Sequence, residues 1–163
     1  MKRIIIYTLT VACCGVIAYA AAKQLSSRQS ADINAPASKV WTILVDPNTW
    51  AEDNPAVKKA KLISGNGEAV GSVVEFYPVV GKKSIKATLT VKVSEKLKKL
   101  EFDVKLLGAT AIMGFELTEQ DGKCTLVNYE TATGAMVNMI SQEDMDWEHK
   151  EWVQSVKRRA EKP

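Results

Sequence analysis

The sequence has few of the residues that metal sites, disulfide frameworks and nucleophilic catalysis require. Among its 163 residues there is one histidine, His149, and there are three cysteines. Cys13 and Cys14 lie in an uncharged N-terminal run, which leaves Cys124 without a partner in the remainder of the chain. A disulfide framework is therefore excluded, and Cys124 is expected to be a small buried apolar residue. One histidine among scattered acids predicts no metal site, and the chain has no glycine motif for a phosphate-bearing cofactor.

The chain also lacks the surplus of basic residues that nucleic-acid binding requires. The net charge is +3, but four of the 22 basic residues precede residue 30, whereas all 19 acidic residues follow it. The remainder of the chain therefore carries 18 basic and 19 acidic residues. A domain with this balance has no strongly basic face for a phosphate backbone, and we predict no nucleic-acid partner.

One long uncharged run lies at the N-terminus. Residues Ile4–Ala22 provide 19 uncharged, mostly apolar side chains behind Lys2 and Arg3. As a helix this run would extend over roughly 28 Å, close to the hydrocarbon thickness of a bilayer. It predicts either a retained membrane anchor or a signal peptide cleaved after Ala20 or Ala22. Both interpretations place the rest of the chain outside the cytoplasm, on the periplasmic or extracellular side.

Length and composition predict one globular domain after this segment. With 46% hydrophobic and 25% charged residues, the chain has enough apolar material for a single core. We assign residues 1–28 to the membrane anchor or signal peptide with a short linker. Residues 29–163 are assigned to the domain.

Two short helices are predicted in the stretch INAPASKVWTILVDPNTW, residues 33–50. Pro36 suits the first turn of a helix, where its missing N–H is no loss. This helix is expected to end near Asp46. Asp46 as N-cap, followed by Pro47 in the first turn, then starts a second short helix through Trp50.

Alternating apolar and polar residues predict an antiparallel hairpin after these helices. Residues 84–93 and 100–106 each direct alternate side chains to one face, and the lysine-rich residues 94–99 form the turn between them. We expect this turn to be solvated, and a contact with anionic lipid head groups is the alternative. Further strands are predicted at residues 73–80, 111–117 and 124–133.

The C-terminal segment predicts a long amphipathic helix. Residues 136–162 contain neither glycine nor proline. The fold class is therefore α+β: a curved antiparallel sheet of about six to seven strands around this helix, with an additional apolar helix at the N-terminus. The residues that recur at helical spacing are Met145, His149, Trp152, Val153, Val156 and Ala160.

The pattern IxAPxxxVWxxLxDPxxW at residues 33–50 resembles the start of the START-like, Bet v 1-like superfamily. More narrowly, it is similar to the bacterial polyketide cyclase/dehydrase and lipid-transport group, the SRPBCC proteins, over about residues 30–162. The resemblance implies a helix-grip fold. In that fold the sheet and the C-terminal helix enclose an apolar cavity that opens near the two short helices.

Candidate ligand-binding residues follow from the resemblance and from strand parity. Trp41 and Trp50 would help to form one end of the cavity or its surrounding core, and the alternative is that both indoles only fill the core. The other candidates are Phe76, Leu89, Phe102, Met113 and Phe115 from the sheet and Trp152 from the last helix.

The last predicted strand allows two orientations. If Leu126 points inward, Asn128 and Glu130 point inward too, where they would hydrogen-bond to a ligand head group. If Val127 points inward instead, Tyr129 accompanies it and Glu130 faces solvent.

Three functions are compatible with these residues. The first is binding of a lipid or other hydrophobic small molecule, for transport or sequestration, at or near the membrane that the N-terminal segment would reach. The second is a cyclase or dehydratase, for which Glu130 and His149 are the candidate acid and base. The third is a protein-interaction domain with a filled core. No pattern indicates an oligomeric state, and no cofactor is predicted.

Overall fold

A computed structural model describes residues 23–81 and 83–163. The predicted N-terminal helix, and with it the choice between anchor and signal peptide, falls outside these ranges. Within them, no helix is both long and apolar enough to cross a membrane.

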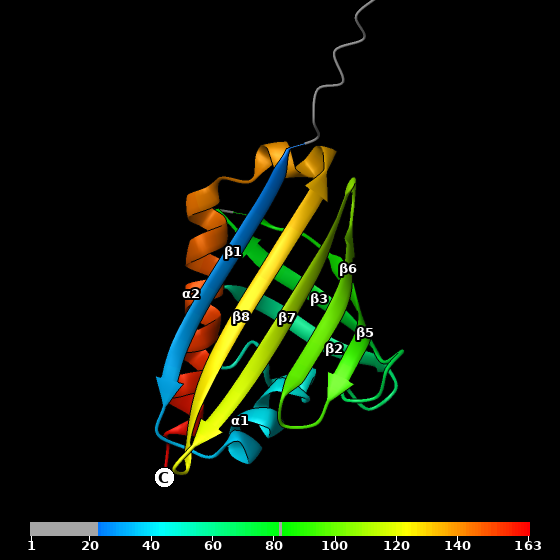
Figure 1. The fold of residues 1–163 in the computed structure, drawn as a ribbon. Helices are drawn as coiled ribbons and strands as arrows, with labels where there is room; N and C mark the ends of the chain where they lie inside the picture. Colours follow the sequence, from blue (N-terminus) through cyan, green and yellow to red (C-terminus); the bar gives the residue numbers. More distant parts are fainter. Residues whose placement is uncertain (1–22, 82) are drawn as a thin grey trace, which may run out of the picture.

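The domain is built on one curved antiparallel sheet (Figure 1). Seven strands follow in the order β1-β8-β7-β6-β5-β3-β2, and the two-residue strand β4 pairs with β3. The sheet curves around the C-terminal helix, which confirms the predicted helix-grip architecture. The strands are β1 (Gln24–Ile33), β2 (Val57–Ser64), β3 (Val73–Val80), β4 (Lys83–Ser84), β5 (Ala87–Glu95), β6 (Lys99–Leu106), β7 (Ala109–Gln120) and β8 (Lys123–Gly134).

The first strand includes residues that we assigned to the linker. β1 starts at Gln24 and pairs with β8 along its whole length. Leu25 and Ser27 are buried and alternate with exposed neighbours, as expected for a strand with one covered face. Residues 24–28 therefore continue the sheet.

Two short helices follow β1, as predicted. Helix α1 (Ala37–Leu44) follows Pro36, and the 3₁₀-helix η1 (Pro47–Thr49) follows Asp46. The carboxylate of Asp46 accepts a hydrogen bond from the backbone N–H of Asn48 at 3.2 Å. Asp46 is thereby confirmed as the cap of the second helix.

The C-terminal helix is shorter than predicted. Helix α2 runs over Gln142–Ala160, whereas Ala135–Met139 form a separate 3₁₀-helix, η2. Between them, the hydroxyl of Ser141 accepts a hydrogen bond from the N–H of Asp144 at 3.0 Å. An N-cap residue has extended backbone, here φ −81° and ψ 154°, so the helix cannot continue through Ser141. The lack of glycine and proline did not reveal this break.

Five aromatic side chains fill the space between the sheet and α2. Trp50 makes edge-to-face contacts with Phe76, Phe102 and Trp152, at 6.1, 5.8 and 5.2 Å between ring centroids. Phe115 packs against Trp152 at 5.4 Å. Aromatic pairs favour this geometry. The centre of the domain is therefore occupied by these five rings, which we call the aromatic cluster.

We expect Trp152→Ala to lower the free energy of unfolding by about 3–5 kcal/mol, because it deletes the indole that three of the other four rings contact. Trp152 is 1% exposed, whereas Trp147 on the same helix is 38% exposed. Trp147→Ala is therefore the matched control, with an expected cost below about 1 kcal/mol. Urea unfolding followed by circular dichroism measures both values. Equal costs would contradict a central role for the aromatic cluster.

Candidate functional site

A small cavity lies between the sheet and the first half of α2. Its volume is about 40 Å³, enough for a few water molecules or one small polar group. Two carboxylates face it, Glu130 from β8 and Glu148 from α2. The rest of its lining is apolar and consists of Phe76, Pro78, Val80, Ile85, Ala87, Val104, Leu106, Met113 and Ile140.

Larger hollows lie on the surface of the domain and are open to solvent. One of about 310 Å³ follows the outer side of β6, β7 and β8, where it is lined by Asp103, Thr110 and Thr131 among other residues. Thr110 and Thr131 are exposed, and their hydroxyls lie within hydrogen-bond distance of Thr133 and Ser26. We place the candidate site at the inner cavity, because its polar groups are shielded from solvent.

The structure decides the orientation of β8. Leu126 and Asn128 are buried and Glu130 faces the cavity, whereas the Tyr129 hydroxyl bonds to Glu101 on the outer side of the sheet. The first of the two predicted orientations is confirmed. Asn128 is fully buried, and its amide nitrogen donates a hydrogen bond to the backbone carbonyl of Gly114 at 3.1 Å.

His149 is fully buried on the inner face of α2 and meets two residues of β8. Its Nδ1 lies 2.5 Å from Oδ1 of Asn128, and its Nε2 lies 3.4 Å from Oε2 of Glu130. Because the amide nitrogen of Asn128 donates to Gly114, the amide oxygen faces the ring and Nδ1 carries the proton. Nε2 has no hydrogen-bond partner among the described residues.

Glu148 is the member of this site that sequence analysis missed. Its side chain is buried, and burial, with the nearby Glu130 carboxylate as second cause, raises the pKa of Glu148 well above 4.5. The signal was present in the helical spacing, because Glu148 lies three residues after Met145 and four before Trp152. A carboxylate at an apolar position of an amphipathic helix is rare and marks a candidate site.

We call Asn128, Glu130, Glu148 and His149 the polar cluster. Asn128 orients the imidazole, and Nε2 of His149 faces the Glu130 carboxylate at 3.4 Å. The Glu130 carboxylate can accept hydrogen bonds, and a protonated Glu148 can donate one. The arrangement therefore has the groups needed both to bind a polar ligand group and to move a proton. Within residues 23–81 and 83–163, no three His, Cys, Asp or Glu side chains are placed to hold a metal ion.

Four of the ten predicted ligand-binding residues belong to the cavity lining or to the polar cluster. Phe76, Met113 and Glu130 line it, and Asn128 contacts His149. The other six do not line it. Trp41 lies on α1, where its indole N–H donates to the Glu68 carboxylate at 3.2 Å. The remaining five are packed in the core: Trp50, Leu89, Phe102, Phe115 and Trp152. A ligand contact for any of the ten stays a prediction.

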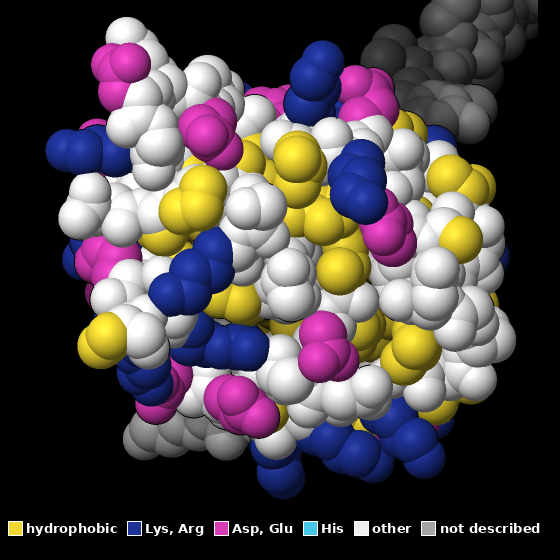
Figure 2. Space-filling model, turned by 90° about the horizontal axis from the view of Figure 1, so that it is seen from below, with side chains coloured by type: hydrophobic (Ala, Val, Ile, Leu, Met, Phe, Trp, Pro, Cys, Tyr) yellow, Lys and Arg dark blue, Asp and Glu magenta, His cyan; other side chains and the backbone are white. Residues whose placement is uncertain are grey.

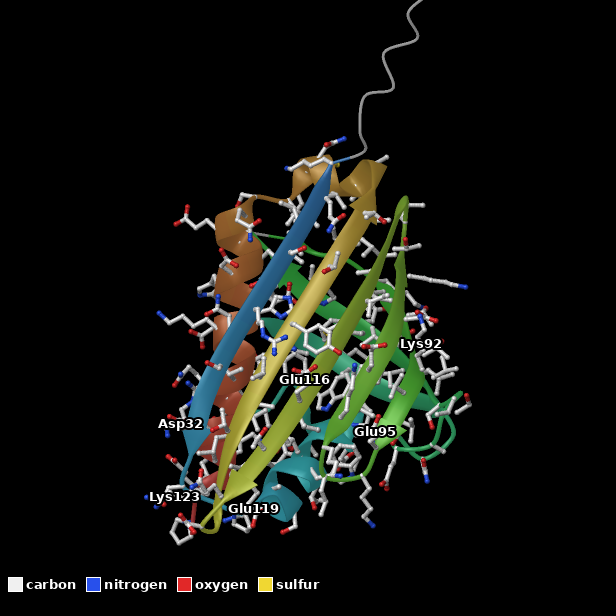
Figure 3. All side chains as sticks on the ribbon, in the orientation of Figure 1. Asp32, Lys92, Glu95, Glu116, Glu119 and Lys123 are labelled. Carbon is white, nitrogen blue, oxygen red and sulfur yellow. The ribbon has the colours of Figure 1, made fainter. Side chains whose placement is uncertain are left out.

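The outer face of the sheet, opposite the polar cluster, carries charged side chains, among them Glu116 (Figure 3), which accepts a hydrogen bond from Arg28 at 2.7 Å. Tyr129 lies over Gly114, where an added Cβ would approach its Cζ to 2.3 Å. The Tyr129 hydroxyl donates to Glu101 at 2.6 Å, and burial together with this carboxylate raises the pKa of Tyr129 to about 12. The sheet is therefore tightly packed on its outer side at Gly114.

Residues 24–161 match the family described as polyketide cyclase / dehydrase and lipid transport. The match covers most of the chain, and the protein belongs to this family. The predicted family is thereby confirmed. Its description includes both an enzyme class and a transport class, so membership alone does not choose between them.

Solved structures share the fold at low sequence identity. Major latex-like protein 151 of Panax ginseng is 10% identical, with a TM-score of 0.71 over 85% of this chain and 99% of that one. The Zhui aromatase/cyclase of Streptomyces sp. R1128 is 13% identical, with a TM-score of 0.67 over 84% and 96%. A START superfamily protein of Mycobacterium smegmatis is 11% identical, with a TM-score of 0.68 over 85% and 97%. No curated protein sequence matches the chain.

The raised pKa of Glu148 predicts a pH dependence of stability. The unfolded chain releases this proton near pH 4.5, whereas the folded chain keeps it to higher pH. Between the pKa of Glu148 in the unfolded chain and its higher pKa in the folded chain, the folded state binds more protons than the unfolded state. The free energy of unfolding therefore falls as the pH rises through this range. Glu148→Gln removes this loss. We expect the variant to gain stability relative to the native chain from about pH 5 to about pH 8, measured by urea unfolding. A stability difference between the variant and the native chain that does not change with pH would contradict the raised pKa of Glu148.

Proposed function

We propose that the domain binds a hydrophobic small molecule whose polar end enters the cavity between the sheet and α2. The observation that carries this proposal is the placement of the Glu130 and Glu148 carboxyl groups at an otherwise apolar cavity. Behind Glu130, Nε2 of His149 lies 3.4 Å from the carboxylate and has no hydrogen-bond partner among the described residues. Buried polar groups without partners destabilise a fold. A ligand that supplies the missing hydrogen bonds removes this cost.

The polar cluster determines which polar end is favoured. The carboxylate of Glu130 and Nε2 of His149 accept hydrogen bonds, and the described lining of the cavity contains neither lysine nor arginine. A hydroxyl or ammonium group can donate to these acceptors, whereas a carboxylate or phosphate would be repelled by Glu130. The proposed ligand is therefore a hydrophobic alcohol or amine.

The size of the cavity limits how much of the ligand is enclosed. A volume of about 40 Å³ holds the polar end, because the aromatic cluster already occupies the deeper interior. The apolar part of the ligand would lie along half-buried aliphatic side chains at the rim. These are Val80, Ile85, Leu106 and Ile140.

We further propose that this binding takes place at or near a membrane. The support is the uncharged run Ile4–Ala22, which is long enough to span a bilayer as a helix. A ligand of this chemistry would itself partition into lipid, so a tethered domain would find it at high local concentration.

Acid–base catalysis is a second candidate function, and the same cluster favours it. Glu148, with its raised pKa, is a proton donor, and Glu130 or His149 is the proton acceptor. The description of the family as cyclases and dehydrases supports this alternative. It requires both roles to act on one bound substrate, so a ligand released chemically changed would distinguish catalysis from binding.

Calorimetric titration with octylamine, octanol and octanoate tests the preference for a donating polar end. We expect the amine and the alcohol to bind at least about ten times more tightly than octanoate, because both donate to Glu130 and His149. Glu130→Gln should weaken octylamine binding by about tenfold or more. Glu116→Gln, on the outer face, is the matched control and should leave every affinity unchanged. Tighter binding of octanoate would contradict the proposed ligand class.

Ala87→Leu tests the location of the ligand, because Ala87 lines the cavity and the longer side chain would fill it. We expect the variant to lose probe binding while its circular dichroism spectrum stays that of the native fold. Native mass spectrometry of the full chain extracted from membranes measures ligand that co-purifies. If neither a probe nor a co-purifying molecule binds, the proposal fails, and an interaction domain with a filled core remains.

A further inference from the structure

The end of the domain that carries the cavity rim also exposes two large apolar side chains. Leu107, in the turn between β6 and β7, is 83% exposed, and Met139, at the end of η2, is 72% exposed. Their sequence neighbours Leu106 and Ile140 line the cavity. We call the surface formed by these four residues and Met136 the apolar end.

Contacts between η2 and the β6–β7 turn hold the apolar end together. The N–H of Met136 donates to the carbonyl of Gly108 at 3.2 Å, and the Met136 side chain packs next to Gly108. Figure 1 shows η2, this turn and the start of β1 at the same, upper end of the domain. Leu107 and Met139 therefore lie beside the rim of the cavity.

The chain enters the domain at this surface. Nζ of Lys23 donates hydrogen bonds to the backbone carbonyls of Val137 and Ile140, at 3.3 and 3.2 Å. Lys23 is the only residue between the uncharged run Ile4–Ala22 and the first residue of β1. The two peptide steps from that run to the strand span at most about 7 Å. A membrane anchor in this run would therefore bring the apolar end against the bilayer.

We propose that the apolar end is a docking surface for the lipid bilayer and that the cavity opens toward the membrane. The free energy falls when exposed leucine and methionine side chains move from water into the acyl-chain boundary. A hydrophobic ligand would then pass from the bilayer to the rim without crossing water. The direction of ligand exchange rests on the function proposed above, and docking rests on the retained-anchor interpretation of Ile4–Ala22.

The opposite end of the domain carries charged side chains. Figure 2, which views that end, shows side chains of Lys and Arg and of Asp and Glu among and around apolar side chains. The lysine-rich turn at residues 94–99 also lies away from η2. Lys99 pairs with Glu116, whereas Leu106 pairs with Ala109 at the other end of the β6–β7 hairpin. Docking through the apolar end therefore excludes a simultaneous contact of this turn with the same bilayer.

Fluorescence quenching on the full chain, reconstituted in vesicles of phosphatidylcholine and phosphatidylglycerol, tests the docking surface. Cys13, Cys14 and Cys124 are replaced by alanine, and the label NBD is attached through Met139→Cys or, as matched control, Val70→Cys. Val70 is also well exposed, at 67%, but lies on the loop between β2 and β3. We expect lipids with acyl-chain quenchers to quench the label at position 139 at least about five times more strongly than the label at position 70.

A charge placed inside the docking surface provides the second measurement. Leu107→Glu should reduce quenching of the label at position 139, because a carboxylate resists transfer into the acyl-chain boundary. Ile63→Glu, at an exposed position of β2, is the matched control and should not change it. Circular dichroism verifies that both variants are folded.

Equal quenching at the two labelled positions would overturn the docking proposal. Protection of the label at position 139 without quenching by lipid would also overturn it, because a second copy or the chain's own apolar run would then cover the surface. Quenching without any bound probe or co-purifying molecule would support docking while the proposed ligand binding fails. Ligand binding without quenching would support the proposed ligand binding and overturn the docking proposal.

Discussion

The packing of α2 against the concave side of the sheet is the interaction on which the rest of the structure depends. Trp152 enters the aromatic cluster, and one turn earlier Glu148 and His149 meet the cavity and β8. One helix face thus provides both an apolar contact with the aromatic cluster and the burial of polar groups. A buried indole stabilises a core by about 3–5 kcal/mol, whereas an unpaired polar group costs about 1–3 kcal/mol. The packing of the indole therefore offsets part of the cost of the acidic site in the interior.

The polar cluster is organised around one fixed element and two groups that have no hydrogen-bond partner among the described residues. Asn128 is held by Gly114 and holds Nδ1 of His149, so the imidazole has a defined orientation. Nε2 of His149 and the carboxyl group of Glu148 instead face the acidic end of the cavity. Aliphatic residues of similar volume would fill this space at lower cost. Under the proposed function, this polarity binds the polar end of the ligand, and the description of the family includes both an enzyme class and a transport class.

Local patterns made most of the fold predictable, because strand alternation and the helix start at Asp46 and Pro47 each depend on only a few neighbouring residues. The orientation of β8 was not predictable, since Leu126 and Val127 are both apolar and either parity buries one of them; pairing with β1 and β7 decides it. The extent of the cavity depends on how rings from separate elements interlock, which no single segment encodes. Glu148 could have been found, because it falls on the inner stripe of the predicted helix.

Gly114 connects the two faces of the sheet. Its carbonyl fixes the Asn128 amide on the inner side, and on the outer side the ring of Tyr129 takes the space that a side chain at this position would need. Any residue other than glycine would have to displace the phenol or shift the backbone, and a shifted carbonyl would release the amide that sets the tautomer of His149. The phenol of Tyr129 on the outer side and the imidazole of His149 in the interior thus depend on the same glycine. A substitution of Gly114 would therefore change which nitrogen of His149 carries the proton.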